Sequence, residues 1–258
     1  MAKTKRYVRV RAGRLVSSVI YDQPTAADEP KARSAKQKIS SEARRRLNRK
    51  QSRQKLEALL HANFIGADLF VTLTFRDEDL PGTREMTMRA VGKYIDTLRK
   101  TRAARGERLI YVLTIEHIRD DGTEGRWHAH LIVNRTASGN DYEELRSLWA
   151  RWGDNVEIEA LGSDAQAFTT RAAYMSKERV PNGKRCWSCC RGLARPVTTS
   201  ELVDEALTIA PPPGAVILEQ ETMSNGWGSF LYIKYVMPEP PRRRRKDPPA
   251  ARGNSVSG

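Results

Sequence analysis

Cysteines, aromatic residues and long apolar runs are all scarce in this sequence of 258 residues. The three cysteines, Cys186, Cys189 and Cys190, follow no secretory signal, because the basic residues at 1–15 lead into no apolar segment. Their thiols are therefore expected to be reduced rather than joined in a disulfide framework. No run approaches the roughly 18 apolar residues that a membrane helix needs. We expect a soluble, intracellular protein that does not interact with a membrane.

Two kinds of site are also missing from the sequence. It contains no G-x-x-x-x-G-K-[ST] loop, which argues against a fused ATP-driven motor of that type. Cys186, Cys189 and Cys190 lack a second pair of ligands at zinc-finger spacing. A zinc site would need a remote histidine as well, so buried or idle thiols are the favoured interpretation.

The positive charge of the chain is concentrated at its two ends. The net charge is +14, and residues 1–60 carry 17 Lys and Arg against 5 Asp and Glu, while residues 241–258 carry 6 against 1. The intervening residues carry 22 against 25. Basic ends on a near-neutral middle favour a nucleic-acid partner, because Lys and Arg bind phosphate backbones without reading sequence. A solvated basic surface is the alternative. The residues expected to contact DNA are Arg44, Arg45, Arg46, Arg49, Lys50 and Arg126.

Composition divides the chain into four segments. They are a basic N-terminal arm with a helix (1–66), a globular core (67–182), an extension packing on that core (183–237) and a disordered Arg- and Pro-rich tail (238–258). The arm is expected to be polar up to a helix over 36–61. The extension is expected to hold a short helix at 200–207 and strands at 215–221 and 229–236.

The hydrophobic periodicity of the core predicts the order β-α-β-β-α-β-α. Strands are expected at 69–75, 109–118, 127–134 and 155–160, and helices at 83–105, 141–152 and 165–178. Asp121-Gly122 is a turn signal between the two middle strands. The first six elements follow the ferredoxin-like split βαβ pattern. The predicted fold class is therefore α+β, with a ferredoxin/RRM-like, mostly antiparallel sheet and flanking helices.

Two histidines at alternate positions form the sharpest local feature of the sequence. His128 and His130 point to the same face of a strand, where paired imidazoles can bind a divalent metal. Glu116 on the preceding strand adds a carboxylate, and such a set suits Mg²⁺ or Mn²⁺ acting on a phosphate. A shift of one residue in the hairpin would present His117 instead. A pair of structural sheet histidines is the alternative interpretation.

A tyrosine and a lysine lie near each other on the last predicted helix of the core. Tyr174 and Lys177 are three residues apart and hence neighbours on one helical face. A phenol with a pKa of about 10 is a weak nucleophile at neutral pH. A nearby ammonium and a metal on the target phosphate would stabilise the phenolate and the developing charge. We therefore identify Tyr174 and Lys177 as candidate catalytic residues, although the same spacing occurs in many ordinary helices.

Three segments together carry a resemblance to a known family. Phe70–Phe75 is a β-strand on which Thr72 and Thr74 share a face, Trp127–Val133 contains the histidine pair, and Tyr174–Lys177 follows. In this order and spacing they resemble the HUH endonucleases, specifically the single-tyrosine replication-associated proteins of rolling-circle phages and plasmids. The resemblance covers about residues 68–180.

The resemblance implies an activity and a set of partners. Tyr174 would nick single-stranded origin DNA, form a 5′-phosphotyrosyl link and later religate the strand. A host helicase and polymerase would be partners in the cytoplasm of a bacterial host cell. A transposase or relaxase of the same superfamily is one alternative. A non-catalytic DNA-binding regulator on the same fold is another.

Overall fold

The chain forms two five-stranded antiparallel sheets and four helices within the residues that the structure, a computed structural model, describes. These residues are 5–22, 41–118, 123–177, 186–203, 207–225 and 228–239. The predicted α+β fold class is therefore confirmed. Within the same residues, no helix is both long and apolar enough to span a membrane.

The first sheet, here called the site sheet, has the strand order β6-β3-β5-β4-β7. Its strands are β3 (Leu69–Thr74), β4 (Tyr111–Ile118), β5 (Glu124–Val133), β6 (Val156–Ala160) and β7 (Trp187–Cys189). The first four strands in chain order take the antiparallel arrangement of a split βαβ unit, as the sequence predicts. The short strand β7 extends the sheet beyond β4. The expected Asp121-Gly122 turn lies outside the described residues.

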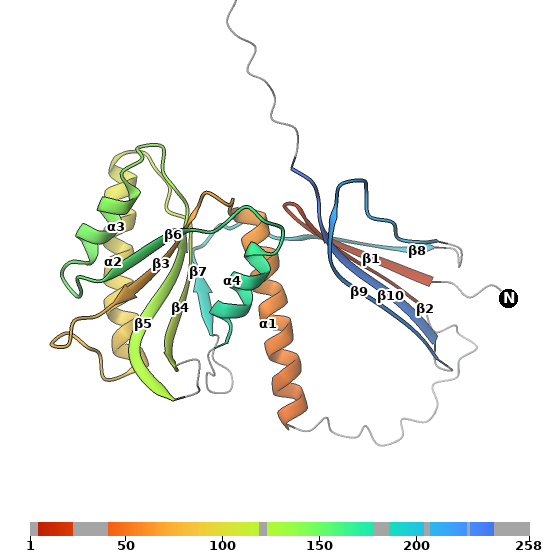
Figure 1. The fold of residues 1–258 in the computed structure, drawn as a ribbon, viewed down its shortest axis with the longest axis horizontal. Coiled ribbons are helices and arrows are strands. Elements are labelled where there is room, and N and C mark those ends of the chain that lie inside the picture. The colour runs from red at the N-terminus through yellow and green to blue at the C-terminus, as the bar shows by residue number, and fades with distance from the viewer. Residues whose placement is uncertain are drawn as a thin grey trace, which may run out of the picture.

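Helices cover both faces of the site sheet. α2 (Arg84–Ala104) and α3 (Asp141–Trp149) pack on one face, and α1 (Ser41–Asn63) and α4 (Ala167–Met175) lie against the other (Figure 1). Alternate residues of each strand serve the two cores, because successive side chains point to opposite faces. Leu69 and Leu73 of β3 thus pack with α2 and α3, while Phe70 packs with α1 and α4.

Polar residues replace apolar ones at one end of the face that α1 and α4 cover. Val112 and Ile132 belong to the core on that face. Continuing along the same face, β4 carries Thr114 and Glu116, and β5 carries His130. All three polar residues are buried, with exposed fractions of 2–4 %. The alternation therefore leads from a hydrophobic core directly into a buried polar cluster.

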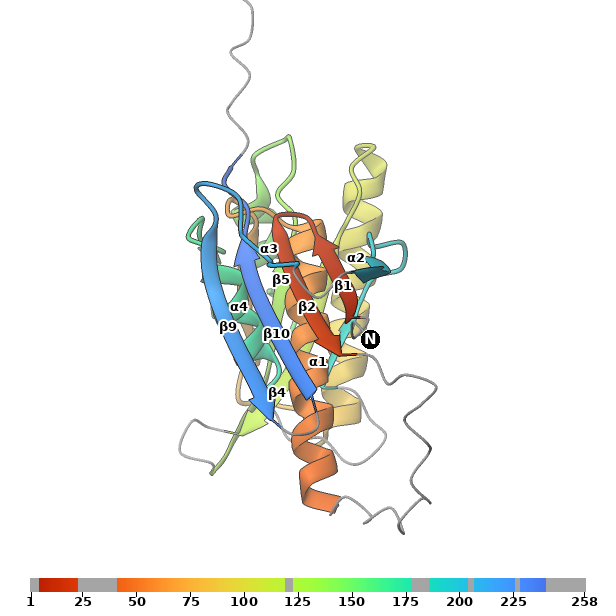
Figure 2. The ribbon, with the colours of Figure 1, turned by 90° about the vertical axis from the view of Figure 1, so that its right-hand side faces the viewer.

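The second sheet has the strand order β8-β1-β2-β10-β9 (Figure 2). Its strands are β1 (Lys5–Ala12), β2 (Leu15–Asp22), β8 (Val197–Val203), β9 (Val216–Asn225) and β10 (Gly228–Val236). The polar arm expected before α1 instead contains the β1–β2 hairpin. Gly13 at its turn has φ +54°, and an added Cβ would lie 1.9 Å from the carbonyl oxygen of His61. Glycine is therefore required there both by the backbone and by the close approach of α1.

The C-terminal expectations were only partly met. The strands predicted at 215–221 and 229–236 are present as β9 and β10, but the helix predicted at 200–207 is wrong. The segment is strand β8, which pairs with β1 from Val197 to Val203. Its β-branched residues fit a pleated strand, and the hydrogen bonds of the free edge of β1 outweigh a weak helical pattern. Most of the predicted disordered tail, 240–258, lies outside the described residues.

α1 connects the two sheets (Figure 1). Its small residues Ala58 and Ala62 pack against Ala12, Leu15 and Val236 at one end of the second sheet. A buried charge adds to this contact. Glu57 of α1 accepts hydrogen bonds from Thr169 Oγ1 of α4 at 2.6 Å and from Lys234 Nζ of β10 at 3.3 Å. The second sheet is therefore attached to both helices that cover the site.

Candidate active site

The histidine pair lies on the central strand of the site sheet. β5 pairs with β3 on one side and with β4 on the other. In this register His128 is opposite Glu116, and His130 is opposite both Thr114 and Thr72. Residues paired directly across antiparallel strands point to the same face. The two imidazoles and the carboxylate therefore meet on the face covered by α4.

The three side chains bring their donor atoms together. Glu116 Oε2 lies 3.0 Å from His130 Nε2 and 3.9 Å from His128 Nε2. One ligand atom from each residue falls within 4.8 Å of the others. Among the residues that the structure describes, no other group of His, Cys, Asp or Glu meets this condition, so the cysteines form no such cluster.

His117, the alternative third ligand, lies elsewhere. Its ring stacks on Trp127 with a centroid distance of 4.1 Å. Both residues follow or precede the cluster residues by one position and so point to the opposite face of the hairpin. The geometry thus gathers Glu116, and not His117, with His128 and His130.

Burial and neighbouring charges favour the protonation states that bind metals. Burial by itself would raise the pKa of Glu116, but hydrogen bonds from His130 and Lys177, together with their charges, lower the pKa below its ordinary value. Burial lowers the pKa of His130, with opposition from its hydrogen bond to Glu116. A carboxylate and a neutral imidazole are the forms that ligate a divalent cation.

Hydrogen bonds fix the orientation of both imidazoles. Thr72 Oγ1 lies 3.1 Å from Nδ1 of His130, and the carbonyl oxygen of Arg126 lies 2.9 Å from Nδ1 of His128. Each ring therefore directs its Nε2 toward Glu116. Metal-binding histidines in proteins are commonly held in this way through their second nitrogen. The residues present fit a divalent cation bound by two imidazole nitrogens and one carboxylate oxygen, with positions left for water and phosphate.

Tyr174 and Lys177 reach the cluster from α4. The Tyr174 hydroxyl lies 3.2 Å from His130 Nε2, and Lys177 Nζ lies 2.7 Å from Glu116 Oε1. Lys177 Nζ also lies 4.0 Å from the centroid of the Tyr174 ring. The helix ends at Met175, three residues before the predicted end, because Ser176 turns its hydroxyl back to the Ala172 carbonyl at 2.6 Å. Lys177 therefore reaches Glu116 from the turn after the helix.

The sequence pattern did not single out the aromatic support beneath the site. Phe70 stacks on His130 at a centroid distance of 5.3 Å, and the guanidinium of Arg171 lies 4.3 Å from the Phe70 ring. Arg171 also pairs with Glu159 at 2.8 Å. The available signal was alternation, because Phe70 lies two residues before Thr72 on the same face of β3.

The basic residues expected to bind DNA are not part of the cluster. Arg44, Arg45, Arg46, Arg49 and Lys50 are exposed on the N-terminal half of α1, and Arg46 pairs with Glu42 at 2.6 Å. Arg126 lies next to the site on β5. Its guanidinium pairs with Asp77 and donates to the carbonyl oxygen of Phe75 at 2.8 Å.

The segment that builds this site is similar to a known family. Residues 68–179 match the family model of the ORF2-type replication-associated proteins. The match runs from β3 through α4, includes the cluster, Tyr174 and Lys177, and covers less than half of the chain. It supports a Rep-type protein with a role in initiating replication, and it suggests interaction with DNA. No curated protein and no solved structure matches the chain.

Proposed function

We propose that this chain is a metal-dependent endonuclease of the single-tyrosine HUH type, which nicks single-stranded DNA at an origin and so starts rolling-circle replication. The observation that carries the proposal is the 3.2 Å separation between the Tyr174 hydroxyl and Nε2 of His130. It puts a potential nucleophile beside the donor atoms of a candidate metal site. The similarity of residues 68–179 to replication-associated proteins supports the same activity.

His128, His130 and Glu116 would hold the cation, for which Mg²⁺ or Mn²⁺ is proposed. When bound, such an ion supplies Lewis-acid chemistry, drawing charge from an oxygen of the scissile phosphate. Glu116 divides its oxygens between two tasks. Oε1 accepts from Lys177 at 2.7 Å, while Oε2 faces both histidines. The lysine therefore fixes the carboxylate without occupying the oxygen directed to the cation.

Tyr174 would attack the phosphorus of the scissile phosphodiester. The bond from its phenolic oxygen to phosphorus forms as the bond from phosphorus to the 3′ oxygen breaks. The phenolic proton passes to solvent, and the departing oxygen takes up a proton to become a 3′-OH. Lys177, 4.0 Å from the centroid of the tyrosine ring, would stabilise negative charge on the phenolate. Attack by a 3′-OH on the phosphotyrosyl link would reverse the reaction and rejoin a strand.

Covalent adduct formation tests this activity. The protein is incubated with Mn²⁺ and labelled single-stranded oligonucleotides that tile the replicon carrying its gene, and SDS-resistant complexes are then separated by electrophoresis. We expect an adduct that disappears with Tyr174→Phe and with EDTA. Tyr142→Phe is the matched control, because Tyr142 lies on α3, across the site sheet from the cluster, and is 37 % exposed.

The pattern of adducts distinguishes the proposal from its alternative. An adduct that persists in Tyr174→Phe would assign the nucleophile to another residue and refute the proposed role of Tyr174. The absence of any adduct across the tiled library, with DNA binding intact, would favour a non-catalytic DNA-binding protein.

A further inference from the structure

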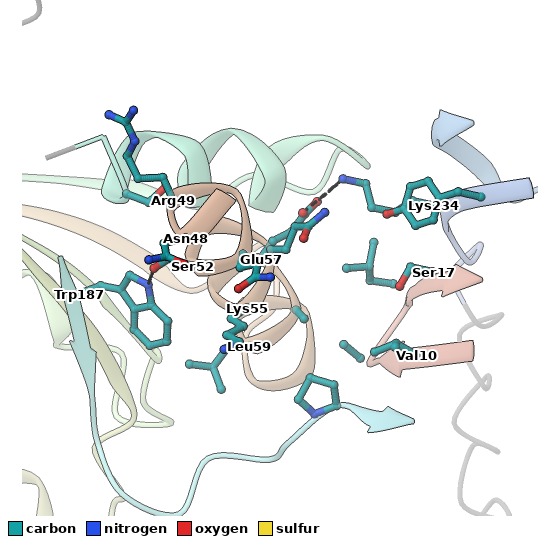
Figure 3. A pocket seen from close by; sticks show the side chains of 18 of the residues that line it. Val10, Ser17, Asn48, Arg49, Ser52, Lys55, Glu57, Leu59, Trp187 and Lys234 are labelled. Carbon is teal, nitrogen blue, oxygen red and sulfur yellow. Dashed lines mark hydrogen bonds and ion pairs between the residues drawn. The ribbon is translucent and has the colours of Figure 1, made fainter. Parts of the chain in front are cut away.

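A large groove separates the N-terminal half of α1 from the second sheet (Figure 3). Its volume is about 1500 Å³, and it is lined by residues of α1, β1, β2 and β10. Its inner end includes Ser176 and Trp187. Ser176 lies between Tyr174 and Lys177 in the chain, and Trp187 pairs with Thr114 beside the cluster. The groove therefore leads to the edge of the candidate active site.

The helical wall of the groove is basic. Arg45, Arg49 and Lys55 line it and are exposed, and none of them forms an ion pair with a described residue. Asn48 and Ser52 lie between them at helical spacing and add polar side chains. From Arg45 to Lys55 the helix rises by about 15 Å. A stacked single strand advances by about 3.4 Å per nucleotide, so this wall has the length of on the order of four nucleotides.

The opposite wall is mainly apolar and aromatic. Val8 of β1, Val19 of β2 and Tyr232 of β10 are paired across three adjacent strands and share the face that lines the groove. Each of them is only partly buried. Trp187 at the inner end adds a second aromatic side chain, whose Nε1 donates to Ser52 Oγ at 3.0 Å. Flat and aliphatic surfaces of this kind suit the faces of unpaired bases.

Ion pairs keep the deeper charges of the groove neutral. Glu57 pairs with Lys234 at 3.2 Å, and Lys234 also pairs with Glu219 at 3.2 Å. Glu42, which lines the outer part, pairs with Arg46 at 2.6 Å. The charge that remains for a ligand is therefore positive and comes from Arg45, Arg49 and Lys55, together with Arg195 at the groove lining.

We propose that this groove binds the single-stranded DNA that enters or leaves the candidate active site, with its phosphates along α1 and its bases against the second sheet. The inference rests on the proposed function and adds to it the path of the substrate strand. A single strand fits the two walls because it offers phosphates on one side and base faces on the other. A duplex presents phosphates on its outside and keeps its base faces stacked within.

Binding of oligothymidylate tests the groove separately from strand cleavage. Fluorescence anisotropy in EDTA measures the affinity of the full chain for labelled oligothymidylate of about 20 nucleotides. Arg45→Gln with Arg49→Gln removes two groove charges. Lys50→Gln with Arg53→Gln is the matched control, because both residues are exposed on the same helix but do not line the groove. Glutamine preserves helix propensity, and circular dichroism checks the fold of each variant.

We expect the groove variant to bind oligothymidylate about ten- to a hundredfold more weakly at about 0.1 M salt, with the salt slope reduced by about 1.4. The control variant is expected to lose less than about threefold. Tyr232→Leu should weaken binding by about five- to 150-fold, the range for one lost base stack, while Tyr232→Phe should retain affinity.

Three results would overturn the groove assignment. They are equal losses in the groove and control variants, which indicate diffuse electrostatic attraction, no loss in either, and a loss confined to duplex DNA. None of these results depends on cleavage, because EDTA is present. Conversely, a selective loss would stand even if no covalent adduct with Tyr174 were found.

Discussion

Replacing Thr72 with valine probes the metal site without touching a proposed ligand. Thr72 Oγ1 lies 3.1 Å from Nδ1 of His130. When Nε2 of His130 binds a cation, Nδ1 must carry the proton and needs an acceptor. Valine has nearly the same shape as threonine and offers none. Because His130 is only 2 % exposed, water does not readily replace the missing acceptor.

Loss of such a supporting hydrogen bond lowers metal affinity by roughly 10- to 100-fold, or about 1.4–2.8 kcal/mol. The burial of His130 leads us to expect the upper half of this range for Thr72→Val. Titration of Mn²⁺ into the protein, followed by electron paramagnetic resonance of the free ion, measures the dissociation constant. Thr72→Ser should restore most of the affinity, because serine keeps the hydroxyl.

The same strand provides the matched control. Thr74 lies opposite His128, whose Nδ1 instead contacts the carbonyl oxygen of Arg126 at 2.9 Å. Thr74→Val should therefore leave Mn²⁺ affinity within about twofold of the parent protein, since it removes no support from either imidazole. Equal affinities for the Thr72→Val and Thr74→Val proteins, with both folded, would refute the proposed role of Thr72.

Two further predictions concern the stability of the fold. Arg102 is fully buried and pairs with Asp141 and Glu144, each at 3.0 Å, so Arg102→Met should lower the free energy of unfolding by about 3–5 kcal/mol in urea titrations. A loss below about 1 kcal/mol would contradict this reasoning, and exposed Arg105→Met should change little. Burial, followed by the charges of Arg14 and Lys234, lowers the pKa of His61 from 6.5 to about 4. The unfolded chain therefore takes up a proton between these pH values that the folded chain does not, and stability falls as the pH is lowered through this window, by about 3 kcal/mol in total. His61→Gln should remove this part of the pH dependence, and equal shifts of the urea midpoint for both proteins between pH 7 and 4 would argue against it.

Local patterns in the sequence were sufficient for the core elements and for the face on which the site lies. The two-residue period of a strand places His128 and His130 on one side whatever the rest of the chain does. The order of strands and helices between 69 and 178 likewise limits the sheet to few arrangements, and the split βαβ one is observed. Both inferences depend only on neighbours in sequence and on rules of chain connection.

The third donor of the cluster required the register of the hairpin. A shift of one residue exchanges Glu116 for His117, and no local pattern excludes that shift. In the folded protein His117 stacks on Trp127, and Glu116 accepts from His130 and Lys177. The choice is made by contacts between β4, β5 and the end of α4, which are distant from one another in sequence.

Sequence patterns were enough to identify the strand that carries the histidines, the helix that carries Tyr174 and the basic character of α1. The pairing of β1 and β2 with β8, β9 and β10 in one sheet is visible only in the folded chain, with nearly the whole sequence between the partners. Such pairing depends on which free strand edge meets another after the chain has folded, and single-segment periodicity carries no record of it. The groove beside α1 arises from the same assembly, because its two walls come from opposite ends of the sequence.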